Sequence, residues 1–267
     1  MGIYDIDGNL MLSAYDIDGT EKSVFYDIDG GIISMPSDYV EYANGTIEAV
    51  TVSSPLGTLA KVQSFLVHNG KYYSTDGSSI AVQGSDFTVE NTTSLSVGHG
   101  NGFQLGADGK GYISGWDDQK VYVINLSDVS IDSTITLPTT GYTTVAVDTA
   151  NGYMYILQRD TRPNTESVYN FIKYDFVNDS IISTVQTTKS FGALQSCDFY
   201  DGKVYLTYGT GTSTLPCGLD VYDTSGNLLA EYTLEIFAST ETEGLFVDRA
   251  TGEILLSLYD KKVYRIT

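Results

Sequence analysis

Two glutamates separated by one residue, Glu241 and Glu243, are the strongest candidates for catalytic groups in this sequence. Paired carboxyl groups can serve as acid and base when a glycosidic bond lies between them. Neighbours on one strand more often place one carboxyl in a channel and the other on its rim, so a glycosidase pair would need help from elsewhere. We therefore interpret Glu243 as a lone hydrogen-bond acceptor or metal ligand.

Other catalytic arrangements are not supported by the residue types present. The chain has two histidines, His68 and His99, and two cysteines, which are too far apart to supply the three or four ligands of a zinc site. A serine hydrolase would need a Gly-x-Ser-x-Gly elbow, and the sequence has none. The sequence therefore predicts no catalytic residues and no resident metal or cofactor.

Polar residues recur where the packing of a strand would favour Val or Ile. They stand in five short runs, Gln63-Ser64, Gly98-His99-Gly100-Asn101, Thr143-Thr144, Gln195-Ser196 and Thr242-Glu243-Gly244. Buried polar groups lose free energy unless they have partners. The pattern predicts a ligand site lined by His99, Asn101, Thr143, Gln195 and Glu243; a channel whose waters satisfy these groups is the alternative.

Aromatic residues follow or precede these runs. Four of them are expected near the same site: Trp116, Tyr142, Tyr208 and Phe246. Flat apolar rings can stack on the C–H face of a sugar. Most Tyr and Phe residues must pack the core instead, and Trp116, between Ser-Gly and Asp-Asp, is the best candidate for ligand contact.

A divergent repeat explains how these residues are brought together. Turn glycines stand at 70, 109, 152, 202 and 252, and are separated by 39 to 50 residues. Each follows an alternating strand and precedes two more, and outer strands are expected at 132–137, 180–186 and 228–234. Four short strands in each unit are typical of a β-propeller blade. Five units predict an all-β, five-bladed β-propeller over residues 39–267.

The ring is expected to close through an N-terminal strand. The last unit ends after three strands, and one spare strand is predicted upstream at 47–52. Lending that strand to the last blade would remove two open sheet edges. The two cysteines, Cys197 and Cys217, fall in the first and third strands of the fourth unit. Those strands are about 9–10 Å apart, too far for a disulfide, so both thiols are expected to be free and buried.

An acidic leader, residues 1–35, precedes the propeller. The pentapeptide YDIDG occurs at 4–8, 15–19 and 26–30, a period of 11 residues. Asp-Gly between short apolar stretches predicts a tight hairpin in each unit. Such hairpins are too short to bury a core, so a partner protein or other copies of the chain are expected to pair with them. Calcium in these turns is a weaker alternative, because Gly8 falls at position 4 of a loop that needs it at position 6.

The charge of −20 excludes several functions. Binding to nucleic acid or to an anionic membrane surface depends on Lys and Arg. No apolar run approaches the length of about 20 residues that spans a bilayer, and the first residues lack the basic and apolar regions of a signal peptide. Residues 1–33 carry a net −6. The remaining charge disfavours a bare polyphosphate and favours a neutral or cation-bridged ligand.

Three stretches resemble a known family. Gly98-His-Gly-Asn-Gly-Phe103, Gly111-Tyr-Ile-Ser-Gly-Trp-Asp117 and Lys120-Val-Tyr-Val-Ile124 resemble the blade signature of helveticin-like proteins and of receptor-binding proteins of phages that infect Gram-positive bacteria. The YDIDG units resemble leaders of phage and prophage tail-associated proteins. The resemblance implies a tail-borne module that recognises a cell-surface glycopolymer, with His99, Asn101, Gln195 and Glu243 lining the site. Gly102 stands where that motif usually has a polar or acidic residue.

Three functions remain open at this point. The first is a glycan-binding module. It would stand on a virion tail, or on the bacterial surface if it is secreted without a recognisable signal, and it would be cytoplasmic while it is synthesised. Its leader would attach it to other tail proteins. The second is a propeller enzyme, similar to glutaminyl cyclases or lactonases, that uses Glu243 as its acid. The third is a structural interaction hub. An enzyme would need a second titratable group beside Glu243.

Overall fold

The computed structural model describes the side chains of residue 59 and of residues 61–266, apart from 163–164, 235–239 and 260. Between residues 3 and 49 it describes the backbone of eight short strands. The chain divides into two compact units, Met1–Val40 and Glu41–Thr267. No described helix is long and apolar enough to cross a membrane.

In the first unit, short strands pair antiparallel on the two sides of each YDIDG repeat. The pairs are β1 (Ile3–Tyr4) with β2 (Leu10–Met11), β3 (Ser13–Tyr15) with β4 (Glu21–Ser23), and β5 (Phe25–Tyr26) with β6 (Ile32–Ile33). The predicted hairpin repeat is therefore confirmed at the level of the backbone. The acidic side chains proposed for calcium, Asp5 and Asp7 among them, lie outside the described residues.

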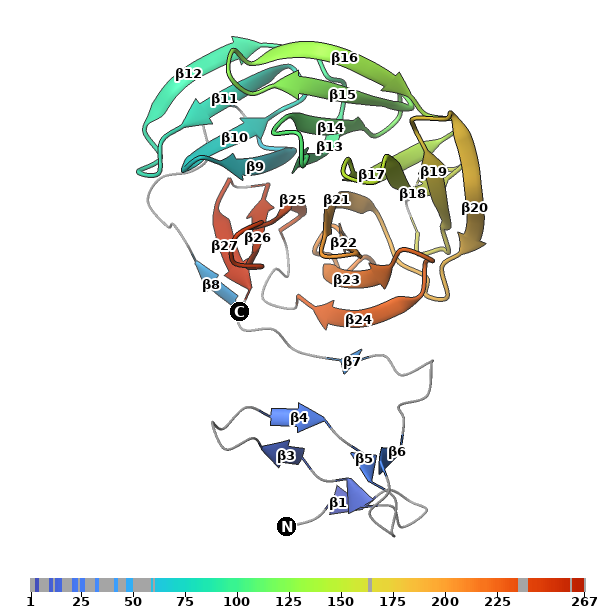
Figure 1. Ribbon diagram of the computed structural model, residues 1–267. Helices are drawn as coiled ribbons and strands as arrows, with labels where there is room; N and C mark the ends of the chain where they lie inside the picture. The colour runs from blue at the N-terminus through green and yellow to red at the C-terminus, as the bar shows by residue number, and fades with distance from the viewer. Residues whose placement is uncertain are drawn as a thin grey trace. The chain divides into compact units, whose positions relative to one another are not determined.

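The second unit is a five-bladed β-propeller, as predicted (Figure 1). Each blade is an antiparallel sheet whose first strand is innermost. Blade 1 is β9 (Ser64–His68), β10 (Lys71–Thr75), β11 (Ser79–Gln83) and β12 (Val89–Ser94); blade 2 is β13 (Gly100–Leu105), β14 (Gly111–Gly115), β15 (Lys120–Asn125) and β16 (Ser130–Thr136). Blade 3 is β17 (Tyr142–Asp148), β18 (Tyr153–Arg159), β19 (Asn170–Asp175) and β20 (Ser180–Gln186).

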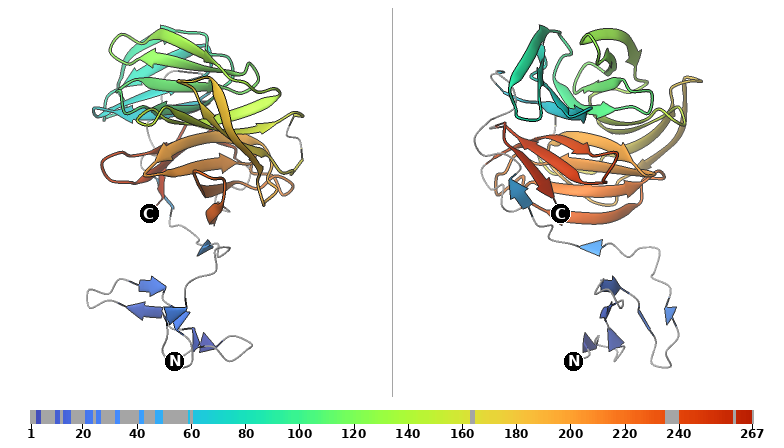
Figure 2. Two further views of the ribbon diagram at one scale, coloured as in Figure 1. Left: turned by 45° about the vertical axis from the view of Figure 1, so that its right-hand side comes forward. Right: turned by 60° about the vertical axis from the view of Figure 1, so that its left-hand side comes forward.

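The last two blades borrow strands from the N-terminal side of the propeller. Blade 4 is β21 (Leu194–Tyr200), β22 (Lys203–Tyr208), β23 (Gly218–Asp223) and β24 (Leu228–Thr233), with β7 (Glu41–Tyr42) added in parallel; blade 5 is β25 (Thr242–Val247), β26 (Ile254–Leu258), β27 (Val263–Ile266) and β8 (Ile47–Ala49). Figure 2 shows these sheets, the blades, from two further sides. Because β8 pairs antiparallel with β27, the expected closure is confirmed; residues 50–52 of the predicted strand lie outside the described residues.

Two outer strands were not predicted, and both have a physical explanation. In β12 nearly every side chain is exposed, so its sequence, VENTTS, has no apolar alternation to mark it. In β7 only two residues pair with β24. Edge strands of this kind form through backbone hydrogen bonds to a neighbour, which a local pattern of side chains does not record.

The core lies between neighbouring blades. Phe65 of the first blade packs against Phe246 of the last, with 6.4 Å between ring centroids, and both are fully buried. The turn glycines Gly70, Gly109, Gly152, Gly202 and Gly252 all have φ between +72° and +78°. Only glycine adopts this conformation without strain, which explains why the residue marks every blade. Cys197 and Cys217 are free and buried, as expected.

Candidate functional site

The five innermost strands bring the predicted polar residues to one mouth, or end, of the ring that these strands form. The innermost strands β9, β13, β17, β21 and β25 stand around the axis of the propeller (Figure 1). Neighbours in this ring contact one another, and β25 contacts β9 to complete it. Residues at the start of each strand therefore share one mouth, and residues at the end share the other.

Three of these strands carry a register shift where a candidate site residue stands. In β13 the shift lies between Gly100 and Phe103, in β21 between Leu194 and Ser196, and in β25 between Thr242 and Gly244. The extra residues therefore include Asn101, Gln195 and Glu243. A β-bulge re-aims a side chain and often lies beside a functional site.

A cavity of about 380 Å³ opens at this mouth. Its lining combines inner-strand residues with residues from six connections between strands: His99, Asn101, Trp116, Arg162, Ala193, Leu194, Gln195, Thr210, Leu215 and Glu241. Four of the six predicted site residues, His99, Asn101, Trp116 and Gln195, lie in this lining. The volume is within the range of pockets that hold small molecules.

One wall of the cavity is aromatic. The ring of Trp116 lies 4.9 Å from that of His99 and 4.6 Å from that of Tyr142, measured between centroids. The indole comes from the loop between β14 and β15, and its backbone N–H donates to the carbonyl oxygen of His99 at 2.9 Å. Tertiary contacts thus hold the ring in place before any ligand arrives.

The two glutamates occupy different depths. Glu243 is 2% exposed and accepts a hydrogen bond from Nε2 of Gln63 at 3.2 Å. Glu241 lines the cavity and accepts a hydrogen bond from Nε2 of Gln195 at 2.6 Å. The two carboxyl groups therefore differ in burial, and Glu241 is the one that lines the cavity.

Burial keeps the inner carboxyl protonated at neutral pH. It raises the pKa of Glu243 to about 9, and the charge of Glu241 adds to the rise while Lys61 opposes it. Burial also raises the pKa of Glu241, against the Gln195 hydrogen bond and Lys61. Burial lowers the pKa of His99, which favours the neutral imidazole. A neutral acid thus stands beside a second carboxyl group.

Several buried polar atoms at this mouth have no hydrogen-bond partner among the described residues. They are Oδ1 of Asn101, Oε1 of Gln63 and Nε1 of Trp116. The other end of the Asn101 amide donates to the carbonyl oxygen of Leu194 at 3.1 Å, which fixes its orientation. Because an unpartnered buried polar atom loses free energy, these groups favour occupancy by water or by a polar ligand.

Some of the predicted residues lie elsewhere. Thr143 is fully buried and donates from Oγ1 to the carbonyl oxygen of Gly115 at 3.2 Å, so it supports the Trp116 loop and does not line the cavity. Glu243 also lies outside the lining, beneath it. The expectation that Phe246 is at the mouth was wrong, because its ring packs in the core against Phe65. Tyr208 is buried beside Lys189, whose Nζ lies 2.5 Å from its hydroxyl oxygen.

Sequence reasoning missed Arg162 and the loop residues Thr210 and Leu215 as parts of the cavity. The local feature that could have marked Arg162 as a cavity residue is its positive charge, which is rare in a chain that has only 14 basic residues. No cluster of three His, Cys, Asp or Glu residues suited to a metal ion occurs in the described part of the chain.

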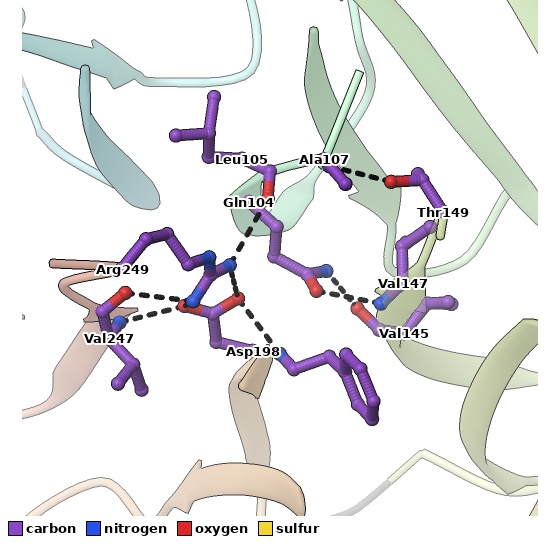
Figure 3. A network of polar contacts seen from close by, with 10 residues as sticks. Gln104, Leu105, Ala107, Val145, Val147, Thr149, Asp198, Val247 and Arg249 are labelled. Atoms are coloured by element: carbon purple, nitrogen blue, oxygen red, sulfur yellow. Dashed lines mark hydrogen bonds and ion pairs between the residues drawn. The ribbon is translucent and has the colours of Figure 1, made fainter. Parts of the chain in front are cut away.

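The opposite mouth is built differently (Figure 3). Asp198, fully buried on β21, accepts hydrogen bonds from Nη1 and Nη2 of Arg249 at 3.0 and 2.5 Å and from the backbone N–H of Val247 at 2.7 Å. Arg249 also donates to the carbonyl oxygen of Leu105 at 3.2 Å. These bonds tie blades 2, 4 and 5 together beside a cavity of about 270 Å³. Asp198 and Arg249 are thus paired with each other, which gives this contact between the blades a structural role.

Comparisons with known proteins support the fold alone. No protein-family model and no curated protein matches the sequence. Among solved structures, the glutaminyl cyclase of Myxococcus xanthus is similar, with a TM-score of 0.61 and 12% identity, over 85% of this chain and 98% of that one. At this level of identity the likeness shows a shared propeller architecture and leaves the activity of this chain to be argued from its own site.

Proposed function

We propose that the chain is a recognition module that binds a cell-surface glycan in the cavity lined by Trp116. The observation that carries the proposal is a cavity lined by Trp116 together with amide and carboxyl groups, among which Oδ1 of Asn101 has no partner in the described part of the chain. Sugars combine an apolar C–H face with hydroxyl groups that donate and accept. Protein sites for such ligands combine an aromatic platform with a few fixed polar groups.

The polar groups of the cavity can accept hydrogen bonds from the hydroxyl groups of a sugar. Oδ1 of Asn101 can accept a hydrogen bond, and the Glu241 carboxylate accepts further ones. Asn101 lies on the inner strand β13, and Glu241, directly before β25, is held by its hydrogen bond from Gln195. The site is therefore preorganised, which limits the entropy lost when a ligand binds.

The leader supports an attachment role. Three short hairpins in Met1–Val40 cannot bury a core of their own, so they suit pairing with tail proteins of a virion or with other copies of this chain. We place the molecule on a phage or prophage tail, with the propeller presenting its glycan site to the surface of a Gram-positive host.

Sedimentation with purified Gram-positive cell walls tests this function. The full chain is expected to sediment with intact walls and to stay in solution with walls stripped of glycopolymer, with and without calcium. Trp116→Ala and Asn101→Ala are each expected to weaken binding by about five- to tenfold. Tyr200→Ala, an aromatic change at the opposite mouth, is the matched control. Unchanged sedimentation of both site variants, with unchanged thermal unfolding, would rule out the glycan site.

A second candidate is cyclisation of an N-terminal glutamine, as in the enzyme whose fold this chain shares. One observation favours it: Glu243 is a neutral acid beside the carboxyl group of Glu241. Two carboxyls whose pKa values are driven apart can divide acid and base roles. The amine nitrogen would bond to the side-chain carbonyl carbon and the bond to the amide nitrogen would break. Glu241 would take the proton lost by the amine, and Glu243, which does not line the cavity, would supply the proton of the departing ammonia by way of Glu241.

Ammonia release from a synthetic peptide with an N-terminal glutamine tests this candidate. The activity is expected to vanish in Glu241→Gln and Glu243→Gln and to persist in Glu253→Gln, a change in an exposed ion pair. If the unaltered chain forms no pyroglutamyl product by mass spectrometry, the enzyme candidate is removed and the glycan proposal stands on its own test.

A further inference from the structure

Arg162 is a cation at the cavity that has no anionic partner in the described part of the chain. It lies in the loop between β18 and β19 and lines the cavity. Arg249 is held by Asp198, and Arg159 donates to the carbonyl oxygen of Thr165 at 2.8 Å. Arg162 instead makes a cation–π contact: its guanidinium carbon lies 5.7 Å from the centre of the Trp116 ring.

This contact leaves the hydrogen-bonding edge of the guanidinium available. A guanidinium above an indole uses its flat face, and its five N–H groups point outward in its own plane. That edge matches the two oxygens of a carboxylate, to which arginine can donate two parallel hydrogen bonds. The indole also fixes the cation next to the surface on which a sugar ring would stack.

Cations as well as carboxyl groups stand around the mouth. Lys61 is a second cation, near enough to lower the pKa of both glutamates and of His99. Against these two cations stand Glu241, which lines the cavity, and Asp117, near His99. Glu243 is neutral at physiological pH. Arg162 and Lys61 thus provide positive charge at this mouth, although the whole chain carries −20.

We propose that the glycan bound here carries a carboxylate, as a uronic acid does, and that Arg162 is the residue that selects it. In this arrangement the sugar ring stacks on Trp116, its carboxylate receives N–H groups of Arg162, and its hydroxyls meet Asn101 and Glu241. This inference rests on the proposed glycan site and adds its substrate class. It also revises the expectation from net charge, which favoured neutral or cation-bridged ligands.

Calorimetry with matched probes tests the selection. The probes are an oligogalacturonate, the same oligomer with its carboxyls methyl-esterified, and a poly(glycerol phosphate). The unaltered chain is expected to bind the acid at least about tenfold more tightly than the ester, because hydrogen bonds to charged groups are the stronger ones. Arg162→Gln is expected to bring the two affinities together, because only the acid loses hydrogen bonds to a charged donor.

Two further variants separate charge from geometry. Arg162→Lys keeps the charge but loses the paired donors, and is expected to retain only part of the preference. Lys110→Gln removes one positive charge from an exposed ion pair with Asp132, far from the cavity in the second blade, and is expected to change neither affinity. Preference for the acid should also fall as salt is added.

The outcomes distinguish this inference from the function on which it rests. Equal binding of acid and ester, unaffected by Arg162→Gln, would overturn the selection and leave a glycan site. Binding of poly(glycerol phosphate) alone, dependent on Arg162, would overturn the carboxylate assignment. Absence of binding to every probe, together with failed sedimentation with cell walls, would overturn the glycan site itself.

Discussion

Nε2 of Gln63 lies 3.2 Å from Oε2 of Glu243, although 180 residues separate them along the chain. Gln63 directly precedes β9 of the first blade, and Glu243 is the bulged residue of β25 in the last. The same two blades are neighbours because the ring is closed. Closure of the ring therefore creates this contact, which no single blade could form.

The buried carboxyl of Glu243 makes stability depend on pH. Its pKa is near 9 in the folded protein and near its usual value of 4.5 when unfolded, so the folded state holds the proton more tightly. This contribution is fully present below about pH 4.5 and is lost as the pH rises toward about 9. We expect the Tm to fall over this range, and to fall less steeply in Glu243→Gln.

Comparison of the two slopes isolates this group. The nearby Glu241 and Lys61, the imidazole of His99 and the overall negative charge remain in both proteins, so their contributions cancel to a first approximation. Equal slopes in calorimetric scans from pH 5 to 9 would show that Glu243 is not the group responsible.

Arg249→Gln is expected to destabilise the propeller by about 3 kcal/mol, because it leaves the fully buried carboxyl of Asp198 without its cation. Urea unfolding measures the loss. Lys110→Gln breaks an exposed ion pair and is expected to lose no more than about 1 kcal/mol. Similar losses in the two variants would contradict the structural role assigned to the opposite mouth.

Gly102→Ala is expected to reduce stability more than Gly109→Ala. Both glycines have positive φ, +98° and +78°, so each substitution costs about 1–2 kcal/mol in backbone strain. At Gly102 a Cβ would also lie 3.1 Å from Oγ of Ser114, whereas at Gly109 nothing lies within 4 Å. Chemical denaturation of the two variants provides the comparison.

Gly102 also follows Asn101 in the bulge of β13, so its substitution should weaken ligand binding along with stability. Gly109→Ala should leave binding unchanged. A Gly102→Ala protein with full affinity and stability would show that this backbone conformation is not required.

Truncation tests the closure of the ring. A chain that begins at residue 41 retains β7 and β8, whereas one that begins at residue 53 lacks both and leaves the edges of β24 and β27 open. We expect the shorter chain to unfold several degrees lower, since about 1 kcal/mol shifts the Tm of a domain of this size by about 2–4 °C. Identical Tm values for the two chains would contradict closure by these strands.

Much of the fold could be predicted from local patterns. The turn glycines, the alternation within each strand and the spare strand before the first blade together indicated five blades and their closure. These features depend on residues close in sequence, because a strand with one buried face alternates with a period of two wherever it occurs. Strands without that signal, β12 and β7, were missed because pairing with a neighbour alone defines them.

The candidate site, unlike the fold, could be predicted only in part. The sequence by itself determined that polar residues such as Asn101, Gln195 and Glu243 enter the inner strands, since their types stand out against Val and Ile. Tertiary structure alone decided which of them line the cavity, that Glu243 is held beneath it by Gln63, and that Arg162 lies over Trp116. Bulges depend on the register between strands, and loop residues reach the channel only when blades distant in sequence pack side by side.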